Sequence, residues 1–165
     1  MNILITGATR GIGKAIADGL EGNIFASGRN EELLKCYENY CVCDLSTRDG
    51  MVKLGSYIEQ NNIDILINNA GEYLYTPVLK GFEYETLEHI TRLNFEAPLY
   101  LISKAVQNMK ENGFGRVINI GSISGVMGEA NASLYSATKA GLRGLTMAMA
   151  KEFGLSGITV NCIEP

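Results

Sequence analysis

The sequence has no long apolar run and no cluster of basic residues. No apolar segment reaches the ~18 residues that a membrane-spanning helix needs, so we expect no membrane partner. The net charge is −4, and without a basic run a nucleic-acid partner is not indicated either. The N-terminus lacks the basic region of a secretory signal peptide. These absences favour a cytoplasmic globular protein.

Residues that could hold a metal ion are also scarce. Histidine occurs once, as His89, and cysteine occurs at positions 36, 41, 43 and 162. Cys41 and Cys43 would share one face of a strand, but no second cysteine pair stands at the spacing of metal ligands. We therefore expect no metal site, and we interpret the cysteines as free thiols in a reducing compartment.

The residues that are present describe one α/β domain. Of the 165 residues, 46% are hydrophobic and 19% are charged, which suits a single domain with a sizeable core. Buried strands alternate with helical patterns, which predicts a parallel sheet with right-handed crossovers and helices on both faces. The expected strands are 2–6, 23–28, 40–43, 63–67, 115–121 and 158–163, and the main expected helices are 14–20, 47–61, 84–112 and 133–154.

The first predicted strand runs directly into a glycine-rich turn. Gly7, Gly11 and Gly13 stand between this strand and the next helix, with the spacing G-x-x-x-G-x-G. Glycine allows close approach of the backbone to a phosphate, and the free N–H groups of a helix N-terminus favour its negative charge. The turn is therefore a candidate dinucleotide-binding loop; the alternative is a plain tight turn.

The residue after the second strand bears on the choice of cofactor. In a dinucleotide-binding fold an acid there would bind the ribose 2′-hydroxyl, whereas Arg29 would accept a 2′-phosphate. Arg10, in the first turn, is a second cation that could face the same phosphate. The sequence thus favours NADP(H) over NAD(H), unless both arginines are simply solvated.

Tyr135 and Lys139 lie one helical turn apart, so they share a face of the predicted helix. Tyrosine alone keeps its proton at neutral pH, whereas a nearby ammonium favours the phenolate. Tyr135 is therefore a candidate general acid. Ser122 supports this interpretation, because it ends the preceding strand at the sheet edge where ligands bind in open α/β folds.

Two other features need to be separated from this set. Tyr100 and Lys104 repeat the same spacing, but they lie inside the long helix, so we interpret Tyr100 as a packing residue. The long helical pattern is itself interrupted by Asn94 and Pro98. Proline removes the hydrogen bond to the carbonyl four residues earlier, which predicts a kink or a freed polar group near Asn94.

Together these motifs resemble those of the short-chain dehydrogenase/reductase family. They include Thr-Gly-x-x-x-Gly-x-Gly at 6–13, Asp44-Leu45, Asn-Asn-Ala-Gly at 68–71, Asn94, Ser122, Tyr135 and Lys139. Residues 115–165 look most like the 3-oxoacyl-[acyl-carrier-protein] reductase subgroup, although sugar, steroid and alcohol reductases share the motifs. The resemblance implies a Rossmann-like, doubly wound fold.

The resemblance also implies roles for individual residues. Tyr135 would protonate a carbonyl oxygen, Ser122 would hold that oxygen, Lys139 would assist Tyr135 and bind the nicotinamide ribose, and Asn94 would order a proton-relay water. The implied cofactor-binding residues are Gly7, Thr9, Arg10, Gly11, Ile12, Gly13, Arg29, Asp44, Leu45, Asn69, Ala70, Gly71, Tyr135 and Lys139.

The chain stops at Pro165, whereas family members usually continue into a substrate-covering loop and a further strand. We therefore expect a single truncated domain, 1–165. Two functions remain open: an NADPH-dependent carbonyl reductase, expected to act on a 3-oxoacyl thioester, or a truncated nucleotide-binding module with little or no turnover. The resemblance further implies a homodimer formed by the helices 84–112 and 133–154.

Overall fold

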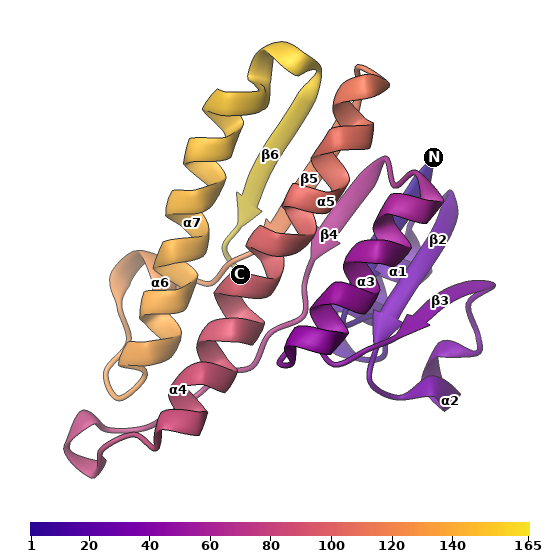
Figure 1. Ribbon diagram of the computed structural model, residues 1–165. Helices are drawn as coiled ribbons and strands as arrows, with labels where there is room; N and C mark the ends of the chain where they lie inside the picture. The colour runs from indigo at the N-terminus through magenta and orange to yellow at the C-terminus, as the bar shows by residue number, and fades with distance from the viewer.

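The computed structural model describes all residues 1–165 and contains six strands and seven α-helices (Figure 1). The strands are β1 (Asn2–Thr6), β2 (Asn23–Gly28), β3 (Asn39–Val42), β4 (Ile65–Asn68), β5 (Gly115–Ile120) and β6 (Ile158–Ile163). The helices are α1 (Gly11–Gly19), α2 (Glu31–Leu34), α3 (Arg48–Asn61), α4 (Tyr84–Thr91), α5 (Ala97–Glu111), α6 (Ile123–Met127) and α7 (Ser133–Phe153). None of these helices combines the length and the hydrophobicity that a membrane span needs.

All six strands are parallel and form one sheet in the order β3-β2-β1-β4-β5-β6. Strands β2 and β3 extend the sheet on one side of β1, and strands β4, β5 and β6 extend it on the other side. In such sheets ligands bind at the carboxyl ends of the strands, where the strand order reverses. The reversal lies between β1 and β4. The predicted Rossmann-like, doubly wound fold is confirmed.

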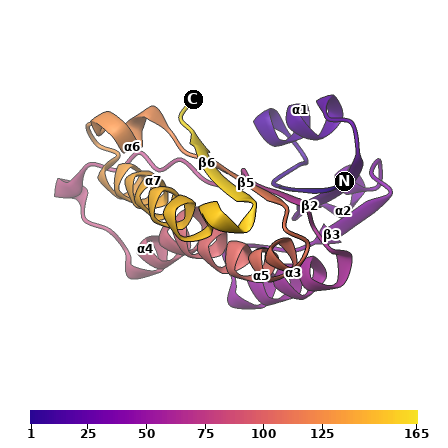
Figure 2. The ribbon, with the colours of Figure 1, turned by 90° about the horizontal axis from the view of Figure 1, so that it is seen from above.

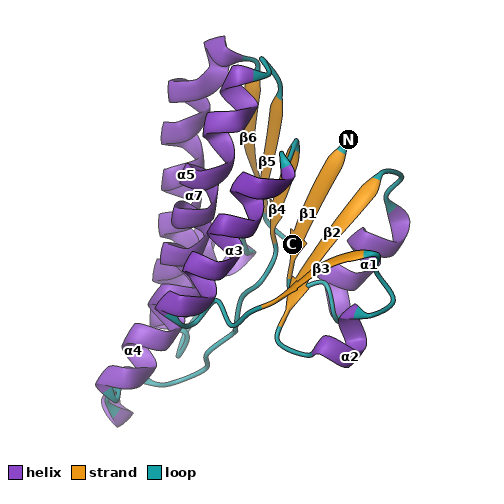
Figure 3. Ribbon diagram, turned by 45° about the vertical axis from the view of Figure 1, so that its right-hand side comes forward, coloured by secondary structure: helices purple, strands orange, loops and turns teal.

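Two layers of helices cover the sheet. Helices α3, α5 and α7 lie on one face, and α1 and α2 lie on the other (Figures 2 and 3). Because side chains alternate along a strand, Leu4 belongs to the core on the α3–α5 side, while Ile3 and Ile5 belong to the core on the α1 side. All three are almost completely buried.

The predicted long helix 84–112 is interrupted at the expected place. Between α4 and α5 the segment Arg92–Glu96 is a π-helix, and Pro98 stands in the first turn of α5. A π-helical turn inside an α-helix inserts an extra residue and frequently marks a functional site. Its central residue, Asn94, is buried.

The short helix α6 is not among the helices expected from the sequence. Ser122 starts this helix: its Oγ accepts a hydrogen bond from the Ser124 backbone N–H at 3.2 Å. Gly125 then lets α6 pack closely on α7, since a Cβ at that position would lie 2.7 Å from the carbonyl carbon of Lys139.

Candidate active site

A cleft of about 730 Å³ opens at the carboxyl edge of β1, β2, β3 and β4. It is lined mainly by turns that follow these strands, as the fold requires. The predicted cofactor-binding residues that line it are Gly7, Thr9, Arg10, Gly11, Ile12, Arg29, Asp44, Leu45, Asn69, Ala70 and Gly71. The structure therefore brings together residues that are up to 64 positions apart in the chain, such as Gly7 and Gly71.

The glycine-rich turn has the geometry of a phosphate cradle. Gly7 and Gly11 have positive φ angles of 68° and 56°, which residues with a side chain rarely adopt. Gly13 is buried and does not line the cleft; a Cβ there would lie 2.3 Å from the Gly7 carbonyl oxygen. Gly13 thus seats α1 against the turn, and the backbone of the turn remains open to an anionic group.

The ends of β1 and β4 are tied together beneath this turn. The hydroxyl of Thr6 accepts hydrogen bonds from the backbone N–H groups of Asn69 and Ala70, at 3.0 and 2.9 Å. The Asn69 side chain in turn donates to the Thr6 carbonyl at 2.9 Å. These bonds fix the floor of the cleft where the strand order reverses.

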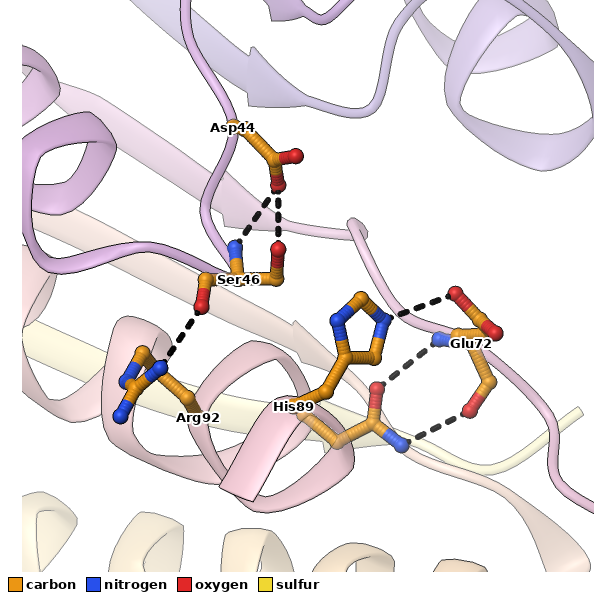
Figure 4. Close-up of polar contacts among 6 residues, drawn as sticks. Asp44, Ser46, Glu72, His89 and Arg92 are labelled. Carbon is orange, nitrogen blue, oxygen red and sulfur yellow. Dashed lines mark hydrogen bonds and ion pairs between the residues drawn. The ribbon is translucent and has the colours of Figure 1, made fainter. Parts of the chain in front are cut away.

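Asp44 lies at one end of the cleft and is held by its neighbour (Figure 4). Its Oδ1 accepts hydrogen bonds from the Ser46 N–H at 2.9 Å and the Ser46 hydroxyl at 2.7 Å. Burial alone would raise the pKa of the Asp44 carboxyl, but the bonds from Ser46 and the charge of Arg29 outweigh it, and the pKa is lowered. Arg29 and Arg10 are both exposed at the cleft, so two cations share it with the carboxyl groups of Asp44 and Glu72.

A second cavity, of about 350 Å³, adjoins the first on the β5 side. Ser122, Tyr135 and Lys139 line it together, although they come from the end of β5 and from α7. Five residues line both cavities: Ile12, Asn69, Gly71, Glu72 and Tyr73. Three of the four predicted catalytic residues, Ser122, Tyr135 and Lys139, therefore face a space that adjoins the cleft lined by the glycine-rich turn.

Lys139 is the one buried cation of this second cavity, with 4% of its surface exposed. Its ammonium donates a hydrogen bond to the Ile120 carbonyl at 2.7 Å and lies 5.9 Å from the centre of the Tyr135 ring. Burial lowers the pKa of Lys139, and the nearby Cys162 and Glu164 oppose that effect. The Tyr135 ring also packs edge-on against Tyr73, with 5.0 Å between ring centres.

Asn94 lines neither cavity, but its side chain binds the backbone of Glu72, which lines both. Its Oδ1 accepts from the Glu72 N–H, and its Nδ2 donates to the Glu72 carbonyl, both at 2.9 Å. The Glu72 side chain is paired with His89, with 3.1 Å between Oε2 and Nε2 (Figure 4). Helix α4 and the π-turn thus hold the segment that follows β4 from two sides.

The second tyrosine–lysine pair lies elsewhere. The Lys104 ammonium sits 5.7 Å from the Tyr100 ring centre and donates to Glu59 at 2.8 Å. These contacts join α5 to α3, and neither residue lines a cavity described above. The packing interpretation of Tyr100 agrees with this position.

The sequence analysis missed six residues that line the cleft: Ser27, Gly28, Cys43, Glu72, Tyr73 and Leu93. Glu72 and Tyr73 follow the Asn-Asn-Ala-Gly motif directly, and Leu93 precedes Asn94. Their positions beside recognised motifs were the available signal. No sequence pattern, however, indicates that Tyr73 packs against Tyr135, 62 residues further along the chain.

The sequence matches the family model described as short chain dehydrogenase over residues 1–165. Among curated relatives, it is 39% identical over 172 residues to the 3-oxoacyl-[acyl-carrier-protein] reductase FabG of Rickettsia bellii. That match covers 98% of this chain and 70% of the relative.

Solved structures give the same family. A metagenomic short-chain oxidoreductase in complex with NADP is 27% identical, with a TM-score of 0.92, and the match covers all of this chain and 81% of that one. A 4-hydroxyisoleucine dehydrogenase complexed with NADH is 34% identical, with a TM-score of 0.90, and the match covers 99% and 74%. The chain is therefore a member of the short-chain dehydrogenase family.

Proposed function

We propose that the chain is an NADPH-dependent oxidoreductase that reduces a carbonyl group to an alcohol. The observation that carries the proposal is the cavity shared by Ser122, Tyr135 and Lys139, which adjoins the glycine-rich cleft. The backbone of that cleft fits a dinucleotide, because Gly7 and Gly11 leave it accessible and Arg10 and Arg29 offer positive charge.

The side chains then have distinct tasks. A bound nicotinamide would supply the hydride that forms the new C–H bond at the carbonyl carbon. Tyr135 transfers its phenolic proton to the carbonyl oxygen, which completes the alcohol and leaves a phenolate. The Ser122 hydroxyl donates a hydrogen bond to the same oxygen as negative charge develops there. Lys139, held by the Ile120 carbonyl, stabilises the phenolate by its charge.

The substrate that we propose is a 3-oxoacyl thioester. Support comes from the curated relative in Rickettsia bellii, which is named as a 3-oxoacyl-[acyl-carrier-protein] reductase and matches 98% of this chain. Helix α6, which begins directly after Ser122, adds exposed apolar side chains, among them Ile123 and Met127. These suit the acyl portion of such a substrate.

Turnover of acetoacetyl thioester with NADPH tests the function, with Tyr135→Phe as the control. The variant removes only the acidic hydroxyl, so we expect it to bind NADPH as the unchanged chain does and to lose at least ~100-fold in kcat. Binding of NADPH without turnover by the unchanged chain would favour the second candidate, a nucleotide-binding module. Equal rates in both proteins would contradict the role of Tyr135.

The preference for NADP(H) is tested separately at Arg29. Arg29→Ala removes a cation that we place beside the 2′-phosphate, so NADPH should bind about tenfold more weakly. NADH lacks that phosphate, and its dissociation constant should change by less than about twofold. Fluorescence titration of both cofactors measures the two effects. An equal loss for both cofactors would mean that Arg29 does not recognise the 2′-phosphate.

A further inference from the structure

The end of β6 places a carboxylate directly behind the predicted catalytic serine. β5 and β6 pair in register through Ile120 and Ile163, so the residues after them, Gly121 and Glu164, are also neighbours. The Oε2 atom of Glu164 accepts a hydrogen bond from the backbone N–H of Ser122 at 2.6 Å. Its other oxygen, Oε1, is buried and has no hydrogen-bond partner.

The position of this carboxylate depends on the absence of a side chain at Gly121. A Cβ added to Gly121 would lie 2.1 Å from Oε2 of Glu164, 2.6 Å from its Cδ and 2.8 Å from the Sγ atom of Cys162. Gly121 has no positive φ angle that would by itself require glycine. The space that glycine leaves at this position is the space that the Glu164 carboxylate fills.

The carboxylate also lies within the electrostatic environment of Lys139. Two titratable groups interact with it: the Lys139 ammonium from α7 and the Cys162 thiol from β6. The pKa of Cys162 is raised to about 11, by burial first and then by its hydrogen bond to Glu164 and the charge of that carboxylate. For Lys139, the negative charge of Glu164 offsets part of the effect of burial.

We propose that Glu164 is a positioning residue for Ser122. By holding the Ser122 amide, it fixes the start of α6 and hence the place from which the Ser122 hydroxyl reaches the carbonyl oxygen. This inference rests on the proposed reductase function.

Two substitutions separate position from charge. Glu164→Gln keeps an oxygen that can accept from Ser122 but removes the charge. We expect kcat to change by less than about threefold, because the acceptor for the Ser122 N–H is kept. Glu164→Ala removes the acceptor as well, and kcat should fall by about tenfold or more with little change in NADPH binding. Unchanged kcat in Glu164→Ala, or an equal loss of kcat in both variants, would overturn the inference.

A measurement without turnover keeps this test separate from that of the reductase function. Gly121→Ala should lower the melting temperature because its Cβ meets the Glu164 carboxylate and the Cys162 Sγ atom, and the loss should be smaller, but not zero, when Glu164 is already alanine. Equal losses in the two backgrounds would show that the carboxylate does not occupy this space. If the unchanged chain binds NADPH but reduces nothing, the reductase proposal fails. The double-mutant cycle of Gly121→Ala and Glu164→Ala then still tests the position of the Glu164 carboxylate.

Discussion

Lys139 shows what the site requires of a single residue. Its ammonium is almost fully removed from water, and its one hydrogen bond in the structure goes to the Ile120 carbonyl. Burial of a charged group is unfavourable unless partners replace the lost water. The lowered pKa of Lys139 expresses that cost, and the role that we propose for the ammonium beside Tyr135 gives a reason to keep it there.

This cost gives Lys139 a definite effect on stability as the pH changes. With its folded-state pKa below the ordinary 10.5, the unfolded chain binds more protons within that interval, so the stability of the unchanged protein rises as pH increases toward 10.5. Lys139→Met should lack this rise. Urea unfolding at several pH values measures the difference in the free energy of unfolding. Lys104→Met is the control: Glu59 raises the pKa of Lys104, so the rise below pH 10.5 should remain.

At the scale of elements, the π-helical turn between α4 and α5 lets the Asn94 side chain hold the backbone of Glu72 by two hydrogen bonds, which we call the Asn94 clamp. An uninterrupted α-helix would place its side chains with a 3.6-residue period, whereas the inserted residue shifts that register. Asn94 then reaches the chain after β4 and bonds both backbone groups of Glu72. The segment that joins the two cavities is therefore set by a helix irregularity.

Asn94→Ala should show how much this clamp contributes. It leaves the backbone N–H and carbonyl of Glu72 without their partners, so the free energy of unfolding should fall by about 2 kcal/mol. Asn108→Ala in α5 is the matched control, because the buried Nδ2 of Asn108 has no hydrogen-bond partner to lose. Its effect should stay below about 0.5 kcal/mol. Chemical denaturation compares the two, and equal losses would contradict the clamp.

The elements also show what the sequence can and cannot predict. Tyr135, Lys139 and Ser122 were recognisable because helical spacing and the position of a strand end follow from local patterns. The interruption near Asn94 was predictable from Pro98. The contact of Asn94 with Glu72 was not, because it depends on how the helix packs against the segment that follows β4. The role of Glu164 was hidden for a similar reason: it arises only because β6 pairs with β5.

At the scale of the whole molecule, α7 presents an exposed row of small side chains to the surroundings. The exposed members are Ala137, Ala140, Gly144 and Ala148, which recur at helical spacing. Small residues allow close approach of a second helix. We propose that this row, with the neighbouring α4 and α5, forms the interface of a homodimer.

Sedimentation velocity tests the dimer. Ala140→Arg places a long charged side chain in the middle of the row, so we expect the population to shift to monomer at micromolar concentration. Ala15→Arg is the control, because Ala15 is an exposed alanine on α1, which covers the opposite face of the sheet. A monomeric unchanged chain, or an equal shift in both variants, would contradict this interface.

The adjoining cavities have a thermodynamic consequence. Arg29 lines only the glycine-rich cleft, and Ser122 lines only the second cavity, so the two residues have no cavity in common. Substitutions at two such positions should therefore combine additively in free energy. Glu72 and Tyr73 line both spaces, so changes there should be non-additive with substitutions at either residue. Occupancy of one compartment would then be communicated to the other through this short stretch after β4.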